Sequence, residues 1–471
     1  MDYKGVSMKY DVVVIGAGPG GYPAAIRLAQ LGKKVLVVEK QSVGGVCLNW
    51  GCIPTKAMCH AAEIRASLGF FQRIGLGVTP SAMEFGKLQA WKDSVVNKLV
   101  KGVEFLFKSQ GIELLRGVGR ITGPGRVQVK GEAVQEVEAD AVIIATGSTP
   151  APLPNVEPDD RKVFYAERAL FFDKIPQSML VIGAGASGLE MAAMYNAFGT
   201  KVTVVEIMDQ AVPGMDTEIA ESMAKLLSKQ GIELHLSSKV VSLDHGYTNL
   251  RAKIESNSGE ITDKDMEKVL LAVGRRPLTD DLWAESVGVD TDAKGFIKVS
   301  PRLETSVQGI YAVGDVTGPP LLAHRATRQG VVAAEVMAGD EAAAYDPAAM
   351  PACVFTIPPA ASVGLTEAEA TKQGLEIEIG RFPYSALGRA ATLGERDGFV
   401  KIIAEKGTGR LLGMHVLGVG ADVMIGEGLL GLEMVATVED IGSTVHPHPT
   451  LLEGIMEAAE NVKKRAIHIK N

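Results

Sequence analysis

Two stretches of the chain repeat one order of apolar and polar positions. Residues 11–39 start with a continuous apolar run, turn through a cluster of glycines, continue with helical spacing and end in a second apolar run that closes on an acidic residue. Residues 178–206 show the same order. Continuous apolar runs of this length are typical of strands buried inside a parallel sheet. The pattern therefore predicts two β-α-β units, with helices over residues 21–31 and 188–198.

The pattern changes in the last quarter of the chain. Strands are predicted over residues 398–404 and 410–416, followed by a helix over 422–436, and this segment has no glycine-rich loop. We therefore expect an α/β protein with two Rossmann-like dinucleotide-binding domains and a C-terminal α+β domain. Three stretches look like domain boundaries: residues 149–160, 275–277 and 339–351. The expected divisions are residues 1–150, 151–276, 277–348 and 349–471.

Composition and charge exclude several classes of protein. Hydrophobic residues make up 46% and charged residues 22% of the 471 positions, as in an ordinary globular protein. The net charge of −8 argues against a nucleic-acid-binding surface, which needs clustered Lys and Arg. No apolar run approaches the roughly 20 residues of a membrane helix. Residues 1–10 lack the features of a leader peptide, so we expect a cytoplasmic protein, although a mature organellar matrix form would have the same sequence.

Each β-α-β unit carries a G-x-G-x-x-G loop between its first strand and its helix. The glycines are Gly16, Gly18 and Gly21 in the first unit and Gly183, Gly185 and Gly188 in the second. Glycine at these positions allows the tight turn, the close approach of a pyrophosphate and the packing of helix on strand. The helix N-terminus then faces the phosphates with the positive end of its dipole. Two such units indicate two bound dinucleotides, or one dinucleotide and a duplicated relic.

An acidic residue closes the second strand of each unit, Glu39 in the first and Glu206 in the second. A carboxylate at this position can accept hydrogen bonds from ribose hydroxyls. Beside Glu206 this favours NAD over NADP, because the extra phosphate of NADP would be repelled and would require a nearby Arg. Residues 202–214 contain no Arg or Lys.

Two cysteines, Cys47 and Cys52, lie four residues apart directly after the first unit. Pro54 favours a helix start, which would place Cys52 at a helix N-terminus where a thiolate is stabilised. Cys47, on the preceding loop, can then fold back to form a disulfide with Cys52. The alternative is that both are small buried residues. Cys59 and Cys353 have no such context, and we expect them to be buried and inert.

The ordered set of motifs resembles the pyridine nucleotide–disulfide oxidoreductase family along nearly the whole chain. In chain order the motifs are the first glycine loop, the cysteine pair, Ala-Thr-Gly-Ser at 145–148, the second glycine loop, Gly-Asp at 314–315 and His-Pro-His-Pro-Thr at 446–450. Within the family, the chain is most similar to the members that oxidise protein-bound dihydrolipoamide. The resemblance implies that electrons pass from the thiol substrate to the Cys47–Cys52 disulfide, then to FAD, and then to NAD.

The resemblance also implies roles for single residues. Asp315 matches the acid that binds the ribityl and phosphate part of the flavin, and Lys56 matches a lysine beside the flavin ring. Glu190 matches the carboxylate partner of that lysine near the nicotinamide. Further cofactor-binding positions are Thr146, Gly147, Ser148, Gly274 and Ala323.

A histidine and a glutamate near the C-terminus match the catalytic base, His448, and the carboxylate that orients it, Glu453. Thiol chemistry needs a base that titrates near neutral pH, which histidine supplies, and a carboxylate can hold its imidazole. His446 is expected either to support the site or to be a turn residue on the surface. No set of metal ligands is expected.

The four divisions take names from the resemblance: the first part of the FAD-binding domain, the NAD-binding domain, a central domain that completes the FAD site, and an interface domain. The resemblance further implies a homodimer that works with a lipoyl-bearing protein of a 2-oxoacid dehydrogenase or glycine-cleavage complex. Three departures from the usual residues, Leu278, Gln329 and Pro359, put local contacts in doubt, and we expect them at the subunit interface.

Other functions remain open at this point. A related flavin disulfide reductase could act on another small disulfide, but glutathione-type reductases use NADPH, which Glu206 disfavours. Mercuric reductases and large thioredoxin reductases carry redox cysteines near the C-terminus, and no cysteine follows Cys353 here. A non-catalytic docking subunit would have lost a cysteine of the pair or His448, and all three are present.

Overall fold

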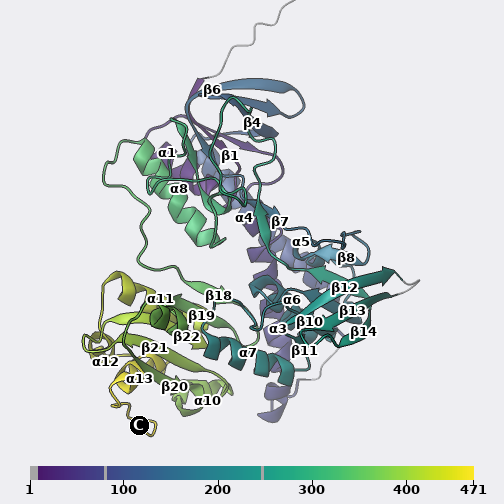
Figure 1. Cartoon of the computed structure of the whole chain (residues 1–471), viewed down its shortest axis with the longest axis vertical. Coiled ribbons are helices and arrows are strands. Elements are labelled where there is room, and N and C mark those ends of the chain that lie inside the picture. Colours follow the sequence, from purple (N-terminus) through teal and green to yellow (C-terminus); the bar gives the residue numbers. More distant parts are fainter. Residues whose placement is uncertain (1–8, 79–81, 246–248) are drawn as a thin grey trace, which may run out of the picture. The chain divides into compact units, whose positions relative to one another are not determined.

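The computed structural model describes residues 9–78, 82–245 and 249–471 (Figure 1). These residues divide into two compact units. Unit 1 comprises Met1–Ala57, Lys87–Ala151 and Gly274–Asp346, and unit 2 comprises Met58–Gly86, Pro152–Val273 and Pro347–Asn471. The last three crossings of the chain between the units fall within three residues of the expected boundaries, but the assignment of 58–86 to unit 2 was not expected. The finer division into four domains stays a prediction.

Unit 1 is built on one mixed sheet with helices on one side. Its elements are β1 (Lys9–Ile15), α1 (Gly21–Gln30), β2 (Val35–Glu39), α2 (Gly45–Asn49), β3 (Glu113–Arg116), β4 (Val118–Gly123), β5 (Arg126–Lys130), β6 (Val134–Ile144), β7 (Ser148–Pro150), β16 (Arg275–Pro277), β17 (Ile310–Ala312), the 3₁₀ helix η1 (Gly314–Thr317) and α8 (Ala323–Met337). The helices α3 (Cys52–Arg73) and α4 (Phe85–Ser109) begin in one unit and end in the other.

The strand order of the unit 1 sheet is β3-β2-β1-β6-β5-β4, and β17 also pairs with β6. The strands β3, β2, β1, β6 and β17 are parallel, and the first half of β6 completes an antiparallel meander with β4 and β5, which precede it in the chain. Val12, Val14, Val35 and Val37 point to the face covered by α1, α8 and the end of α4. The alternate residues pack under the meander on the other face.

Helices α1 and α8 lie side by side on their face of the sheet (Figure 1). The close approach depends on a glycine: a Cβ atom on Gly330 of α8 would lie 2.3 Å from the Gly20 carbonyl oxygen at the start of α1. Because of this packing, the N-terminal half of α8 lies beside the first glycine-rich loop, where Thr327 donates a hydrogen bond to the Pro19 carbonyl (3.1 Å).

Unit 2 contains a parallel sheet and two antiparallel sheets. Its elements are β8 (Val163–Tyr165), α5 (Ala166–Ala169), β9 (Ser178–Ile182), α6 (Ala186–Phe198), β10 (Lys201–Val205), α7 (Thr217–Lys229), β11 (Glu233–His235), β12 (Ser238–His245), β13 (Leu250–Ser256), β14 (Ile261–Met266), β15 (Lys268–Leu271), β18 (Ala352–Val354), β19 (Ala360–Gly364), α9 (Glu367–Lys372), β20 (Ile377–Pro383), η2 (Tyr384–Ala386), α10 (Gly388–Leu393), β21 (Phe399–Glu405), β22 (Leu411–Leu417), α11 (Ala421–Glu433), α12 (Val438–Ser443) and α13 (Glu453–Val462).

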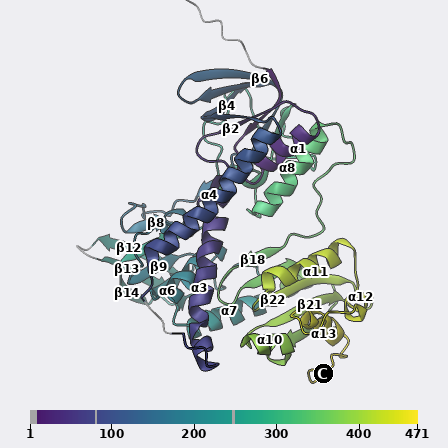
Figure 2. The same ribbon diagram turned by 180° about the vertical axis from the view of Figure 1, so that it is seen from behind.

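The parallel sheet has the order β11-β10-β9-β15-β8, and the three-stranded sheet β12-β13-β14 packs on one of its faces. The C-terminal sheet has the order β18-β19-β22-β21-β20 and is antiparallel throughout. Helices α11 and α13 cover one face of this sheet and share a core with it (Figure 2). The other face carries Arg381, Lys401 and His415 on neighbouring strands.

The α/β class was predicted correctly. Both β-α-β units are present, and the C-terminal strands and helix lie within three residues of their predicted bounds. The stretch expected to be a linker after residue 149 begins as strand β7, which pairs with β16, the other expected boundary. No helix among the described residues is long and apolar enough to cross a membrane. The expectation about a leader falls on residues 1–10, of which 1–8 lie outside the described part.

Candidate active site

The first glycine-rich loop has the sterics expected of a dinucleotide-binding turn. Gly16 has a φ of +105°, and a Cβ there would lie 2.3 Å from the Ala145 carbonyl oxygen. A Cβ on Gly21 would lie 1.8 Å from the Gly16 carbonyl oxygen. By contrast, the nearest atom to a Cβ on Gly18 is 3.9 Å away, so Gly18 faces open space. Two glycines therefore build the turn, and the third leaves room for a ligand.

Glu39 lies at the end of β2 and reaches this loop. Its carboxylate accepts hydrogen bonds from the Ala17 N–H (2.8 Å) and the Gln41 N–H (2.7 Å). A carboxylate retains acceptor capacity after two such bonds, so contact with a ribose is still possible. The sequence analysis predicted only a ribose contact for Glu39 and did not predict that Glu39 also holds the loop backbone.

The second loop repeats this arrangement in unit 2. A Cβ on Gly183 would lie 2.4 Å from the Ala272 carbonyl oxygen, and one on Gly188 would lie 2.0 Å from the Gly183 carbonyl oxygen, while Gly185 has no atom within 4 Å. The Glu206 carboxylate accepts from the Ala184 N–H (2.6 Å) and the Met208 N–H (2.9 Å). The two loops are thus alike in steric detail as well as in sequence.

The cysteine pair is brought together in unit 1 by two successive helices. Cys47 lies in the short helix α2, where a loop was expected, and Cys52 is the first residue of α3, two residues before the expected start at Pro54. Pro54 is tolerated there because N–H groups in the first helical turn have no partner within the helix. Cys52 lies at a helix N-terminus, as predicted, and its side chain hydrogen-bonds that of Cys47.

The electrostatics of the pair distinguish its two members. The hydrogen bond to Cys52 and burial together raise the pKa of the Cys47 thiol far above its usual value, and negative charge on Cys52 raises it further. The ammonium group of Lys56, one helical turn after Cys52, acts in the opposite direction.

The loop that carries Asp315 is tied to the point where the chain leaves and re-enters unit 1. The Ser148 hydroxyl donates to Asp315 Oδ2 (2.6 Å), and Arg275 Nε donates to the same hydroxyl (2.7 Å). Ser148 and Arg275 belong to β7 and β16, the paired strands on either side of the inserted segment 152–273. Arg275 was expected only to mark a boundary, and its role in orienting Asp315 through Ser148 was missed.

Thr146, Gly147 and Leu278 form a second link near this place. The Thr146 hydroxyl donates to the Leu278 carbonyl (2.8 Å), and the Leu278 N–H donates to the Gly147 carbonyl (3.0 Å). Only the backbone of Leu278 takes part, so this departure from the usual residue leaves the link intact. Gly274, with a φ of +113°, accepts through its carbonyl from the Ala151 N–H.

His448 and Glu453 form the predicted pair in unit 2. His448 Nδ1 lies 2.8 Å from Glu453 Oε1, and Glu453 Oε2 accepts from the Thr450 N–H (2.9 Å). Burial acts to raise the pKa of Glu453, but the hydrogen bonds with His448 and Thr450 outweigh it and lower the pKa. The His448 side chain is 78% exposed, so its ring is accessible to a second molecule.

His446, two residues before His448, has a different environment. Its side chain is only 4% exposed and is held between Glu427 Oε1 (2.9 Å) and the Thr444 carbonyl (2.8 Å). Its side chain is therefore buried and hydrogen-bonded, unlike that of a surface turn residue, and a role in supporting the site stays a prediction.

Other predicted positions are found as follows. Glu190 is buried in α6, where Oε1 accepts from the Phe355 N–H (3.0 Å), and its pairing with Lys56 stays a prediction. Ala323 is the first residue of α8. Cys59 is buried as expected, whereas Cys353 is only half buried on the edge strand β18.

Gln329 and Pro359, the two other positions that differ from the usual residues of the family, are buried inside their units. The expectation that Gln329 lies at the subunit interface is wrong: its side chain is 1% exposed in unit 1, because α8 turns that face toward η1. Pro359 is also buried, and its carbonyl accepts from the Gly418 N–H (2.9 Å).

Comparison with known proteins agrees with this arrangement. Residues 10–330 match the model of the pyridine nucleotide-disulphide oxidoreductases, and residues 350–459 match that of their dimerisation domain. The chain belongs to this family. The chain is an oxidoreductase that uses FAD and NAD, and its two glycine-rich loops, with open space at Gly18 and Gly185, fit two dinucleotides.

Several relatives share the full length of the chain. A dihydrolipoyl dehydrogenase from Thermus scotoductus is 48% identical, covering 98% of this chain and 99% of its own. One from Bacillus subtilis is 40% identical over 98% of this chain and 100% of its own. Among solved structures, LpdA from Mycobacterium tuberculosis superposes with a TM-score of 0.88 at 25% identity, covering 96% of this chain and 99% of that one. The HOCl-induced flavoprotein disulfide reductase RclA from Escherichia coli superposes with a TM-score of 0.85, also at 25% sequence identity.

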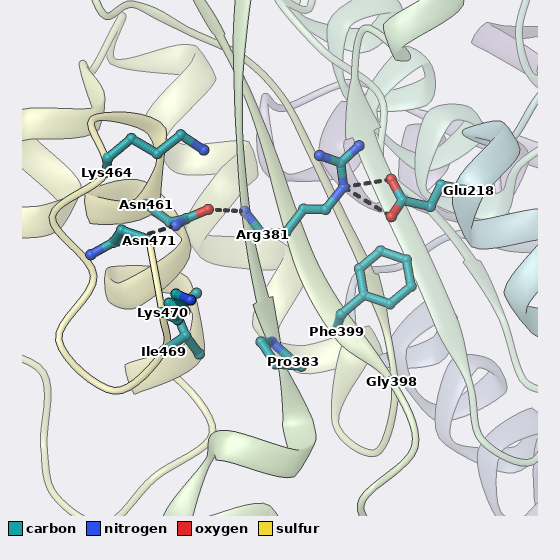
Figure 3. A pocket seen from close by; sticks show the side chains of 10 residues that line it. All are labelled: Glu218, Arg381, Pro383, Gly398, Phe399, Asn461, Lys464, Ile469, Lys470 and Asn471. Atoms are coloured by element: carbon teal, nitrogen blue, oxygen red, sulfur yellow. Dashed lines mark hydrogen bonds and ion pairs between the residues drawn. The ribbon is translucent and has the colours of Figure 1, made fainter.

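A cavity of about 520 Å³ in unit 2 is lined by none of the predicted site residues (Figure 3). It is lined by strands β20 and β21, the start of α7 and the C-terminal tail, including Glu218, Arg381, Phe399, Lys464 and Asn471. Arg381 points across it toward the Glu218 carboxylate (2.7 Å). The cavity has no cysteine, histidine or glycine-rich loop among its lining residues, and we assign it no part in the redox chemistry.

Proposed function

We propose that this enzyme oxidises protein-bound dihydrolipoyl groups to lipoyl groups and reduces NAD⁺. The observation that carries the proposal is that one chain holds a hydrogen-bonded cysteine pair beside a dinucleotide loop together with an exposed His448–Glu453 pair. Full-length relatives named dihydrolipoyl dehydrogenase, at 40–48% identity, support the substrate.

The proposed reaction begins with removal of a proton. His448, held through Nδ1 by Glu453, accepts a proton at Nε2 from one thiol of the substrate. The substrate thiolate attacks the sulfur of Cys47 in the Cys47–Cys52 disulfide, the disulfide breaks, and Cys52 leaves as a thiolate. The substrate is then joined to Cys47 by a mixed disulfide.

The second substrate thiol completes the exchange. It attacks the substrate sulfur of the mixed disulfide, closes the lipoyl ring and releases Cys47, which takes up a proton. The raised pKa of Cys47 favours this outcome, with the proton on Cys47 and the negative charge on Cys52. FAD, held by the loop of Gly16, Gly18 and Gly21 and by Asp315, would supply the two-electron chemistry that returns the cysteine pair to its disulfide and reduces NAD⁺ by hydride transfer.

Cofactor binding is assigned to the two loops and their supports. We assign FAD to Gly16, Gly18, Gly21 and Glu39, with Asp315 at the ribityl and phosphate part. NAD is assigned to the loop around Gly185, with Glu206 at the ribose.

We further propose that the enzyme is a homodimer in which His448 serves the cysteine pair of the other subunit. His448 lies within the segment that matches the dimerisation domain, and its side chain is 78% exposed in the single chain. The lipoyl group would arrive on a protein of a 2-oxoacid dehydrogenase or glycine-cleavage complex, in the cytoplasm.

The test compares two activities of one variant. In His448→Gln, turnover of dihydrolipoamide should fall by at least about a hundredfold, the scale of general acid–base catalysis, while electron transfer from NADH to an artificial acceptor stays near the wild-type rate. Equal loss of both activities would refute the role of His448. If the enzyme is as active with glutathione as with dihydrolipoamide, the proposed substrate is wrong, but the proposed role of the Cys47–Cys52 pair is unaffected.

A further inference from the structure

Gln329 occupies an unusual position for an amide side chain. It lies in α8 and is 1% exposed, yet glutamine is mostly a surface residue. A buried polar group is normally hydrogen-bonded, and its partner identifies what it holds. The Oε1 atom of Gln329 accepts from the Gly314 N–H at 2.8 Å and lies 3.4 Å from the Thr317 hydroxyl. Gly314 and Thr317 are the first and last residues of η1, the turn that carries Asp315.

A second side chain from the same face of α8 holds the end of this turn. Arg325, one helical turn before Gln329, donates to the Gly318 carbonyl (2.7 Å) and the Thr317 hydroxyl (3.1 Å). The guanidinium is buried with the rest of the residue, which is 8% exposed. The turn therefore has one attachment to α8 at its beginning and another at its end.

The backbone of the turn cannot easily find a substitute for the bond to Gln329. Gly314 has a φ of +79°, and a Cβ there would lie 3.2 Å from the Cβ of Ala326, so the backbone is packed directly on α8. The Gly314 N–H would be left without an acceptor in a buried place if Gln329 lost its amide oxygen. Such a loss costs the desolvation of the donor, and the turn would relieve it by moving away from α8.

We propose that Gln329 is a positioning residue for FAD. Its amide oxygen fixes the Gly314 N–H, and through it the direction of the next residue, Asp315, whose carboxylate is oriented from the other side by Ser148 (2.6 Å). Since the group needed is an acceptor and not a charge, glutamate at 329 should serve as well as glutamine, whereas an apolar residue of the same size should not.

The test uses two substitutions at one site and a neighbour as control. Gln329→Leu removes the acceptor at nearly constant volume, Gln329→Glu keeps it, and Arg328→Leu changes the adjacent exposed position of the same helix. The measurement is the dissociation of FAD from the purified holoenzyme, followed by the fluorescence of released flavin. Gln329→Leu should weaken FAD binding about tenfold or more, and the other two should stay within about threefold of wild type.

A second measurement separates positioning from general stability. The circular dichroism of the bound flavin should change in Gln329→Leu and not in Arg328→Leu, because only the former alters the turn at the cofactor. If Gln329→Leu does not fold, Thr317→Val can be measured in its place. It removes the hydroxyl that both Gln329 and Arg325 contact, and it should change the flavin spectrum in the same direction but by less. The proposal is wrong if Leu and Glu at 329 weaken FAD binding equally, or if Gln329→Leu lowers thermal stability while FAD dissociation and the flavin spectrum stay unchanged.

Discussion

Replacing Lys401 with methionine should destabilise unit 2 far more than an ordinary loss of a salt bridge. Lys401 lies in β21 and is 1% exposed, and its ammonium contacts Asp216 (2.9 Å), Glu367 (2.8 Å) and Glu218 (3.2 Å). Asp216 is also 1% exposed, and it caps α7 through a bond from the Glu218 N–H. Lys401→Met keeps the volume and removes the charge, so the buried Asp216 carboxylate loses its main partner.

The magnitude follows from how deeply each partner is buried. Removing one member of a buried ion pair costs about 3–5 kcal/mol, because the other charge stays buried without compensation. Glu218 and Glu367 are 36% and 45% exposed and can turn toward water, so Asp216 accounts for most of this cost. At about 2–4 °C per kcal/mol for a unit of this size, the unfolding midpoint should fall by roughly 10 °C.

The stability that the Lys401–Asp216 pair contributes should depend on pH in a definite direction. Burial alone would raise the pKa of Asp216, but the hydrogen bond and charge of Lys401, the charge of His415 and the Glu367 N–H bond together outweigh it and lower the pKa below 3.8. Burial likewise acts to lower the pKa of Lys401, but hydrogen bonds with Glu367 and Asp216 raise it above 10.5. The stabilisation is therefore complete between these two values and is lost as pH falls through the folded pKa of Asp216 or rises through that of Lys401.

In the variant, Asp216 loses both effects of Lys401 but keeps burial, which raises its pKa, and the Glu367 N–H bond and the charge of His415, which lower it. Its pKa is therefore higher than in the wild type, so it takes up a proton at a higher pH. The stability gap between wild type and Lys401→Met should thus be widest at pH 7 and above, and should narrow as pH falls toward 3.8. Thermal unfolding of the holoenzyme across this range measures the gap. Lys406→Met, which removes an exposed pair with Glu376 (3.0 Å), is the control and should change the midpoint little. Equal shifts in the two variants, or a gap independent of pH, would refute the reasoning.

Three further predictions concern the redox site. Gly188→Ala should disrupt the second loop and abolish NAD-dependent turnover, because the new Cβ would lie 2.0 Å from a backbone oxygen. Gly185→Ala should fold normally and raise the KM for NAD, because no atom lies within 4 Å of its Cβ. An equal loss of stability in the two variants would contradict this prediction. Glu206→Gln should narrow the preference for NAD over NADP by at least about tenfold, measured as a ratio of kcat/KM, and an unchanged ratio would remove Glu206 from nucleotide selection. Refolding inactive Cys47→Ser and His448→Gln subunits together should recover about a quarter of wild-type dihydrolipoamide activity if the base crosses the dimer interface, and none if it acts within its own chain.

Much of the nucleotide sites could be predicted from the sequence because their sterics are local. At Gly16 and Gly183 the positive φ and the backbone oxygen close by leave no room for a side chain, and both follow a buried apolar strand. The strand, the turn and the helix all lie within about 30 residues, so a short stretch of sequence contains the complete nucleotide-binding pattern. The cysteine pair was recognised for the same reason, although the sequence could not show that Cys47 would lie in a helix of its own.

The long-range contacts within each unit could not be predicted in this way because they join distant parts of the chain. Arg275 and Ser148 are 127 positions apart, and Lys401 and Asp216 are 185 apart. Neither pair has a local pattern, since each residue looks like an ordinary polar position until the fold brings its partner close. A short stretch of sequence therefore indicates candidate cofactor-binding positions better than it indicates the distant residues that hold those positions in place.

Gln329 shows what signal could have been used. It follows Arg325 by four residues on a helix in which Ala326, Val332 and Val336 are buried, so a helical projection places both polar side chains near the apolar face. A buried amide and a buried guanidinium require partners, and the backbone of a glycine-rich turn has groups that need them. A polar residue at a position that helical periodicity assigns to the interior thus predicts a bond to nearby irregular backbone. Here that backbone carries Asp315, which is why the departure at 329 bears on the cofactor and not on the subunit interface.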